Sequence, residues 1–72
     1  MNDEVLGLLS NLGAISEEKA VNKEMVAAAL NLKLETFQDD VGRLVSAGYL
    51  KQYGGKIYLT EVGLIRALSR FS

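Results

Sequence analysis

The glycine pair at positions 54 and 55 restricts the fold of this chain more than any other feature. It lies between two short segments, YLKQY at 49–53 and KIYL at 56–59, in which apolar and polar residues alternate. Adjacent glycines adopt the positive φ angles of a two-residue turn at little steric cost. The pattern therefore predicts a β-hairpin over 49–59. Because a two-stranded hairpin is only marginally stable in water, it must pack against the rest of the chain.

The remainder of the sequence has the periodicity of helices. Apolar residues at helical spacing predict helices at about 2–12, 23–30 and 34–47, and a last helix after Thr60. Gly13 and Asn31 suit the left-handed residue that follows a helix end. The inward stripe of the third helix is expected to comprise Leu34, Phe37, Val41, Leu44 and Val45.

The segment between the first two helices allows two interpretations. Ser16, followed by two glutamates, could cap one short helical turn, and Ala20 with Val21 could form a brief extended segment. Asn22 is itself a good cap for the second helix, and Thr60 for the last one. The predicted order is helix, possible short strand, helix, tight turn, helix, hairpin and helix.

Length and residue types exclude several classes of protein. The 72 residues suffice for one domain, 1–72, and 49% of them are hydrophobic, enough for a packed core. Without Cys or His, disulfides and the usual zinc sites are excluded, and we expect no metal and no cofactor. The first 13 residues begin with acids and resemble neither a signal peptide nor a membrane span, so we expect a cytoplasmic protein without membrane contact.

No catalytic constellation is present, and we expect that the chain is not an enzyme. The sequence contains no His or Cys and no glycine-rich phosphate loop. Asp39 and Asp40 are neighbours on a predicted helix, so their side chains point about 100° apart and do not form a carboxylate pair.

Charge is unevenly distributed although the net charge is only −1. Residues 1–32 hold two lysines against five acids, whereas 33–56 hold four basic residues against three acids. Any attraction for nucleic-acid phosphate must therefore come from the second half of the chain.

Residues 21–63, VNKEMVAAALNLKLETFQDDVGRLVSAGYLKQYGGKIYLTEVG, resemble the winged helix-turn-helix family, in particular its small prokaryotic, archaeal-like transcription regulators. The resemblance implies an α+β, mainly α fold with a three-helix core, a β-hairpin wing and a C-terminal helix. It also implies that double-stranded DNA receives the third helix in its major groove and the wing along its backbone. Carried over by position, the outward face of the third helix comprises Glu35, Thr36, Gln38, Asp39, Gly42, Arg43 and Ser46.

The resemblance suggests six DNA-contacting residues. Thr36 and Gln38 occupy positions where base edges would be contacted, with Arg43 beside them; the alternative is that they are solvated polar groups. Phosphate contacts are assigned to Lys33, Lys51 and Lys56, although lysines on exposed strands also deter edge pairing. Tyr53 and Tyr58 beside the turn either stack on a base or sugar or cover the core.

The acids of the third helix support a different partner. Glu35 and Asp39 would repel phosphate, and we expect Asp39 to pair with Arg43 one turn later. The alternative function is a winged-helix module for protein–protein contact, whose acidic third-helix face binds a basic protein.

The last helix carries apolar residues on more than one face. Leu64, Leu68 and Phe71 form one stripe, and Val62 and Ile65 begin another. One stripe packs on the domain, and the other is either a wider core contact or a dimer surface. We expect a homodimer whose interface includes Val62, Ile65, Leu68 and Phe71.

Overall fold

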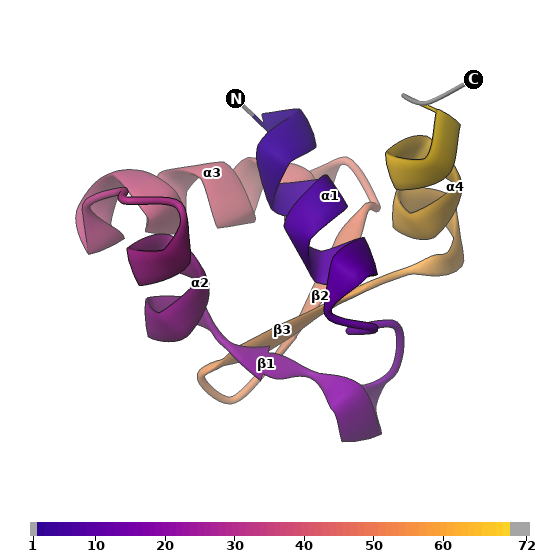
Figure 1. Ribbon diagram of the computed structural model, residues 1–72, viewed down its shortest axis with the longest axis horizontal. Helices are drawn as coiled ribbons and strands as arrows, with labels where there is room; N and C mark the ends of the chain where they lie inside the picture. Colours follow the sequence, from indigo (N-terminus) through magenta and orange to yellow (C-terminus); the bar gives the residue numbers. More distant parts are fainter. Residues whose placement is uncertain (1, 70–72) are drawn as a thin grey trace.

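The chain forms a small α+β fold that is mainly helical, and the computed structural model describes residues 2–69 (Figure 1). Over this range, four α-helices accompany a three-stranded antiparallel sheet and one short 3₁₀ helix. Along 2–69, no helix is long and apolar enough to cross a membrane. The elements are α1 (Asn2–Asn11), η1 (Glu17–Lys19), β1 (Val21–Asn22), α2 (Lys23–Ala29), α3 (Leu34–Ser46), β2 (Leu50–Tyr53), β3 (Lys56–Leu59) and α4 (Glu61–Ser69).

The predicted hairpin is confirmed, and a third strand extends it. Tyr53 pairs with Lys56, so Gly54 and Gly55 form the two-residue turn. Gly54 has a φ of 60° and Gly55 does not share the positive φ, as expected for a type II′ turn. The strand order is β1-β3-β2, with Val21 of β1 paired to Ile57. The segment before α2 contains both a short turn, η1, and an extended segment, β1, which lies at Val21–Asn22 rather than at Ala20 and Val21.

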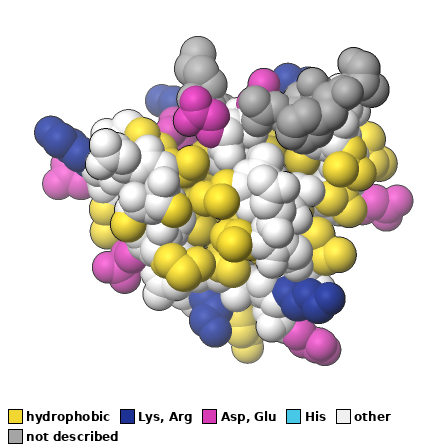
Figure 2. Space-filling model, in the orientation of Figure 1, with side chains coloured by type: hydrophobic (Ala, Val, Ile, Leu, Met, Phe, Trp, Pro, Cys, Tyr) yellow, Lys and Arg dark blue, Asp and Glu magenta, His cyan; other side chains and the backbone are white. Residues whose placement is uncertain are grey.

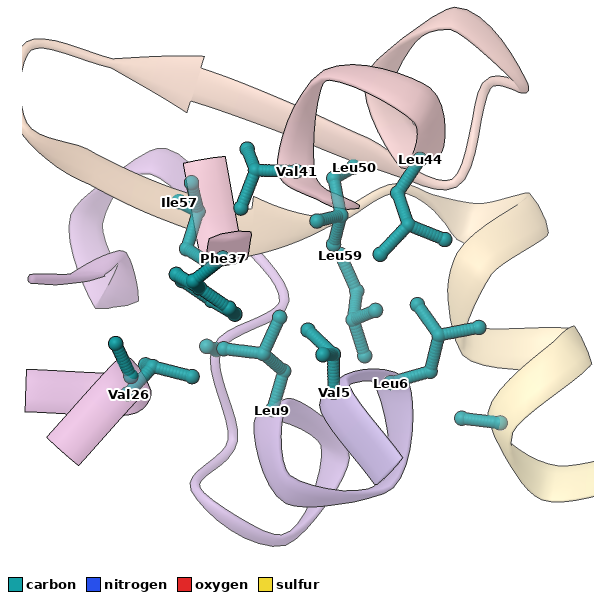
Figure 3. Close-up of a cluster of buried hydrophobic side chains, with 13 residues drawn as sticks. Val5, Leu6, Leu9, Val26, Phe37, Val41, Leu44, Leu50, Ile57 and Leu59 are labelled. Atoms are coloured by element: carbon teal, nitrogen blue, oxygen red, sulfur yellow. The ribbon is translucent and has the colours of Figure 1, made fainter. Parts of the chain in front are cut away.

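The helices pack on one face of the sheet, and a common apolar core lies between the helices and the sheet (Figures 1 and 3). Phe37 and Val41 of α3, 0% and 1% exposed, confirm the predicted inward stripe, whereas Leu34 lies at its edge with 36% exposed. Figure 3 shows these side chains converging with those of α1 and the hairpin. The core contains Val5, Leu6, Leu9, Ala14, Val26, Ala27, Phe37, Val41, Leu44, Leu50, Ile57, Leu59 and Ala67.

Helix ends are fixed as the sequence predicts, with one exception. The Asn22 side-chain Oδ1 accepts a hydrogen bond from the Glu24 backbone N–H at 2.7 Å and caps α2. Asn31 takes the left-handed φ of 57° after that helix. Ser16 precedes η1 but makes no side-chain capping bond, so that turn forms without the predicted cap.

A compact junction joins α4 to the base of the hairpin. Thr60 Oγ1 accepts from the Gly63 backbone N–H at 3.0 Å and donates to the Gly48 carbonyl at 2.6 Å. The Thr60 backbone N–H donates to the Tyr49 carbonyl at 3.0 Å. A Cβ on Gly63 would lie 2.0 Å from that same carbonyl oxygen, so only glycine fits at this position. The junction fixes the direction in which β2 leaves α3.

Candidate nucleic-acid interface

The outer face of α3 is exposed and slightly hollowed. Gln38, Asp39, Gly42, Arg43, Ser46 and Ala47 line a shallow depression on this face. Gly42 has open space where a side chain would be, with no heavy atom within 4 Å of its Cβ position. The depression brings together two of the residues predicted to contact DNA, Gln38 and Arg43, with the carboxylate of Asp39 beside them.

The two predicted base-contacting residues do not share a face. Thr36 and Gln38 are both exposed, but residues two apart on a helix lie about 200° apart around its axis. Gln38 lines the depression and Thr36 does not. Thr36 and Gln38 therefore lie on opposite flanks of the outer face of α3.

The ion pair of Arg43 differs from the sequence prediction. Arg43 Nη1 contacts Asp40 Oδ1 at 3.3 Å, three residues away, rather than Asp39, four residues away. Acids at both spacings are within reach of an arginine on a helix, and Arg43 turns toward the half-buried Asp40. Since Arg43 is the only basic residue of α3, the exposed carboxylates of Glu35 and Asp39 dominate its outer face.

Strand pairing places four side chains together on the exposed side of the hairpin. Lys51 lies opposite Tyr58 across the ladder, and Tyr53 lies opposite Lys56. Lys51, Tyr53 and Lys56 are exposed and Tyr58 is half-buried, while the buried residues of both strands alternate with them. We call these four residues the outer hairpin face. The two cations alternate with the two aromatic rings, and the three strands contain no acidic residue.

The hairpin tip is held against the start of α2. The Lys23 backbone N–H donates to the Gly55 carbonyl at 3.0 Å, and Lys23 Nζ donates to Gln52 Oε1 at 3.3 Å. Lys23 was not predicted from the sequence to belong to this region, because its partners lie about 30 residues further along the chain. The hairpin is therefore a fixed surface rather than a free arm.

A repeated motif could have revealed the outer hairpin face. Both strands contain Lys-x-Tyr, at 51–53 and 56–58, which places Lys and Tyr on one side of each strand. The two tyrosines have different outcomes: Tyr58 packs against the core, whereas Tyr53 is 59% exposed. Lys33 lies on another element, at the exposed position that precedes α3, so the structure groups only Lys51 with Lys56.

The outer side of α4 exposes three predicted dimer residues. Val62, Ile65 and Leu68 are 55%, 58% and 56% exposed, and Figure 2 shows hydrophobic side chains at the surface along α4. The side of α4 that packs on the core instead carries Gly63, Leu64 and Ala67. The predicted stripe of Leu64, Leu68 and Phe71 is therefore wrong, because Leu68 lies with the exposed residues; Phe71 lies outside the described residues.

Neither a search for metal sites nor a comparison with known proteins assigns a function to this chain. In the described part of the chain, no group of three or more His, Cys, Asp or Glu residues could hold a metal ion. No protein-family model, curated protein or solved structure matches this chain. The function must therefore be inferred from the surfaces described above.

Proposed function

We propose that this chain is a winged-helix domain that binds double-stranded DNA in the cytoplasm and regulates transcription as a homodimer. The element order supports the proposal, because an exposed α3 is followed directly by the β2–β3 hairpin, the position of a wing. The observation that carries it is the outer hairpin face, where Lys51 and Lys56 lie on one exposed surface without an acidic residue on any strand. Such a surface attracts the phosphate backbone.

In this proposal the hairpin provides most of the affinity, and α3 contributes orientation. Lys51 and Lys56 contact phosphates, with Lys33 at the start of α3 as a further contact. Gln38 is the base-contacting candidate on the side of the depression, where an adenine edge could accept and donate its two hydrogen bonds. Thr36, on the opposite flank, contacts the groove wall or remains in solvent.

Salt dependence of duplex binding tests the role of the lysines. The logarithm of the binding constant should fall linearly with the logarithm of salt concentration between about 50 and 200 mM. Lys51→Gln and Lys56→Gln should each lower the slope by about one, whereas Lys19→Gln on η1 should leave it unchanged. Absence of duplex binding by the folded protein at low salt would refute the proposal.

The α4 surface supports the homodimer. Val62, Ile65 and Leu68 expose apolar groups at spacings of three residues along one side of a helix, a pattern that pairs with a second copy. Sedimentation equilibrium should give about twice the 7.8 kDa mass of the chain at high micromolar concentration. Ile65→Asp should return the protein to a monomer without loss of helix signal, because this side chain lies outside the core. A monomer mass for the unmodified protein would exclude this part of the proposal.

A second function is favoured by the charge of α3. The pairing of Arg43 with Asp40 leaves Glu35 and Asp39 as exposed carboxylates, which suit a basic protein partner better than phosphate. Combined Glu35→Gln and Asp39→Asn substitutions distinguish the two functions. Duplex affinity should rise roughly fivefold per removed charge if α3 faces DNA. Unchanged duplex affinity, with weaker binding of an oligolysine peptide, would support the protein-binding function.

A further inference from the structure

The outer hairpin face combines rings and cations in an alternating arrangement. Lys51 opposes Tyr58 and Tyr53 opposes Lys56, so each ring has a cation beside it across the ladder and another along its own strand. We infer that this face also binds single-stranded DNA, with an unpaired base stacked on the ring of Tyr53 and the flanking phosphates held by Lys51 and Lys56. Aromatic platforms flanked by cations bind unpaired strands with little dependence on sequence.

Tyr53 is accessible in the way that stacking requires. Its side chain is 59% exposed, whereas its diagonal neighbour Tyr58 is half-buried and packed against the core. Packing against the core therefore accounts for an aromatic residue at position 58 but not at position 53. Its position at the end of β2, next to the Gly54-Gly55 turn, leaves no side chain beyond it on the strand to cover the ring. A base can approach this ring from solvent.

Protection of the sheet edge does not explain both lysines. Lysines on edge strands prevent pairing with other chains, and β2 is an edge strand, so this role fits Lys51. Lys56, however, belongs to β3, which is the central strand with a neighbour on each side. A lysine there has no free edge to protect. Its position beside Tyr53 fits a phosphate contact next to a stacked base.

The paired backbone sets the spacing of the four Cβ atoms. Directly opposed residues have Cβ atoms about 5 Å apart, and diagonal ones about 7–8 Å. The hydrogen bonds from Lys23 to Gly55 and Gln52 hold the hairpin tip in place. The face is therefore formed before a ligand arrives, which reduces the ordering cost of binding.

The exposed ring of Tyr53 suits an unpaired base better than a base pair. Base rings in a duplex are stacked on one another, whereas an unpaired base offers its flat face to a tyrosine. Asn22, which pairs with Lys56, uses its Oδ1 to cap α2 and has only its Nδ2 hydrogens to offer a 2′-hydroxyl. The choice of DNA over RNA rests on the proposed function. The inference that a base stacks on Tyr53 rests instead on the exposure of that ring.

Fluorescence anisotropy with a labelled oligo(dT) of about 12 nucleotides, at about 50 mM salt, tests the inference. The unmodified protein should bind it. Tyr53→Ala should weaken binding about fivefold or more, the range that loss of one base–aromatic stack produces, and Tyr53→Phe should restore it because the ring is retained. Met25→Ala, which removes another exposed apolar side chain from α2, should have no effect. Circular dichroism establishes that each variant is folded.

Parallel titrations with a duplex of equal length and with oligo(rU) separate the possible outcomes. Absence of oligo(dT) binding, or equal affinity of Tyr53→Ala and the unmodified protein, overturns the inference. Duplex binding without oligo(dT) binding overturns it while leaving the proposed function intact. Oligo(dT) binding through Tyr53 without duplex binding supports the inference and refutes the proposed function. Tighter binding of oligo(rU) than of oligo(dT) overturns the assignment to DNA.

Discussion

The outer face of α3 and the outer hairpin face differ in charge and in how they are held. The first carries Glu35 and Asp39 in solvent, and its one arginine is paired with Asp40. The second carries two lysines and no acid on its strands. A helix that docks in a groove should be the more basic of the two, yet in this molecule the hairpin is. The proposal that the hairpin supplies the main DNA contact therefore rests on the distribution of charge and not on the fold alone.

The two surfaces also differ in their connections to the rest of the molecule. The hairpin is joined to α4 through Thr60 and Gly63, and to α2 through Lys23. The outer face of α3 is bounded by solvent, and the Cβ position of Gly42 at its centre contacts nothing. Substitutions of equivalent residues in the two regions should therefore have unequal effects.

The largest difference in stability is expected between alanine substitutions at two glycines. Gly63→Ala should lower the free energy of unfolding by about 3 kcal/mol or more, because its Cβ would lie 2.0 Å from the Tyr49 carbonyl oxygen, a backbone atom. Gly42→Ala, in the open middle of α3, should raise it by about 0.5–1 kcal/mol through helix propensity. Urea denaturation of both variants measures the difference. Equal stabilities would contradict the close contact at the base of the hairpin.

Substitutions at the N-caps of α2 and α3 should differ by a smaller amount in their effect on stability. Asn22→Ala removes the side-chain bond to the Glu24 backbone N–H and should cost about 1 kcal/mol, a fall of roughly 4–8 °C in Tm. Lys33→Ala removes a side chain that makes no capping bond at the start of α3, and should change stability by less than about 0.5 kcal/mol. Thermal unfolding followed by circular dichroism compares them; the reverse order would show that α2 does not depend on this cap.

The smallest effect concerns the ion pair on α3. Asp40→Asn removes the negative charge that pairs with Arg43, and the free energy of unfolding should fall by less than about 0.5 kcal/mol because the Arg43 side chain is 72% exposed and solvent screens the pair. Duplex affinity should nevertheless rise, since Arg43 becomes available for phosphate and one negative charge is lost. If stability falls by several kcal/mol, Asp40 has a structural role that its pairing with Arg43 does not account for.

Local signals made most of the fold predictable. The glycine pair, the alternation on either side of it and the capping residues Asn22 and Thr60 each act over a few residues, and the structure has the elements that they predict. The first three helices each end one residue before the predicted end. Such features depend on backbone chemistry that adjacent residues determine.

The surfaces were less predictable, because they depend on contacts between distant segments. Asp39 and Asp40 lie four and three residues before Arg43, and an arginine on a helix can pair at either spacing, so the sequence did not show that Asp40 is the partner. The outer hairpin face required the strand register, since Lys51 and Tyr58 are neighbours only once the hairpin is paired. Apolar spacing alone did not decide which stripe of α4 packs on the domain. The packed side carries Gly63 and Ala67, which belonged to neither stripe and allow the helix to approach closely, whereas Leu68 is exposed.

Amide chemical shifts recorded by NMR during titration of the isotope-labelled protein with duplex DNA test the central claim most directly. If the outer hairpin face supplies the main contact, the largest shift changes should fall within 51–58, with smaller ones along α3 near Gln38 and Arg43. If the largest changes instead run along the outer face of α3 and leave 51–58 unaffected, the hairpin is not the binding surface and the central claim is contradicted.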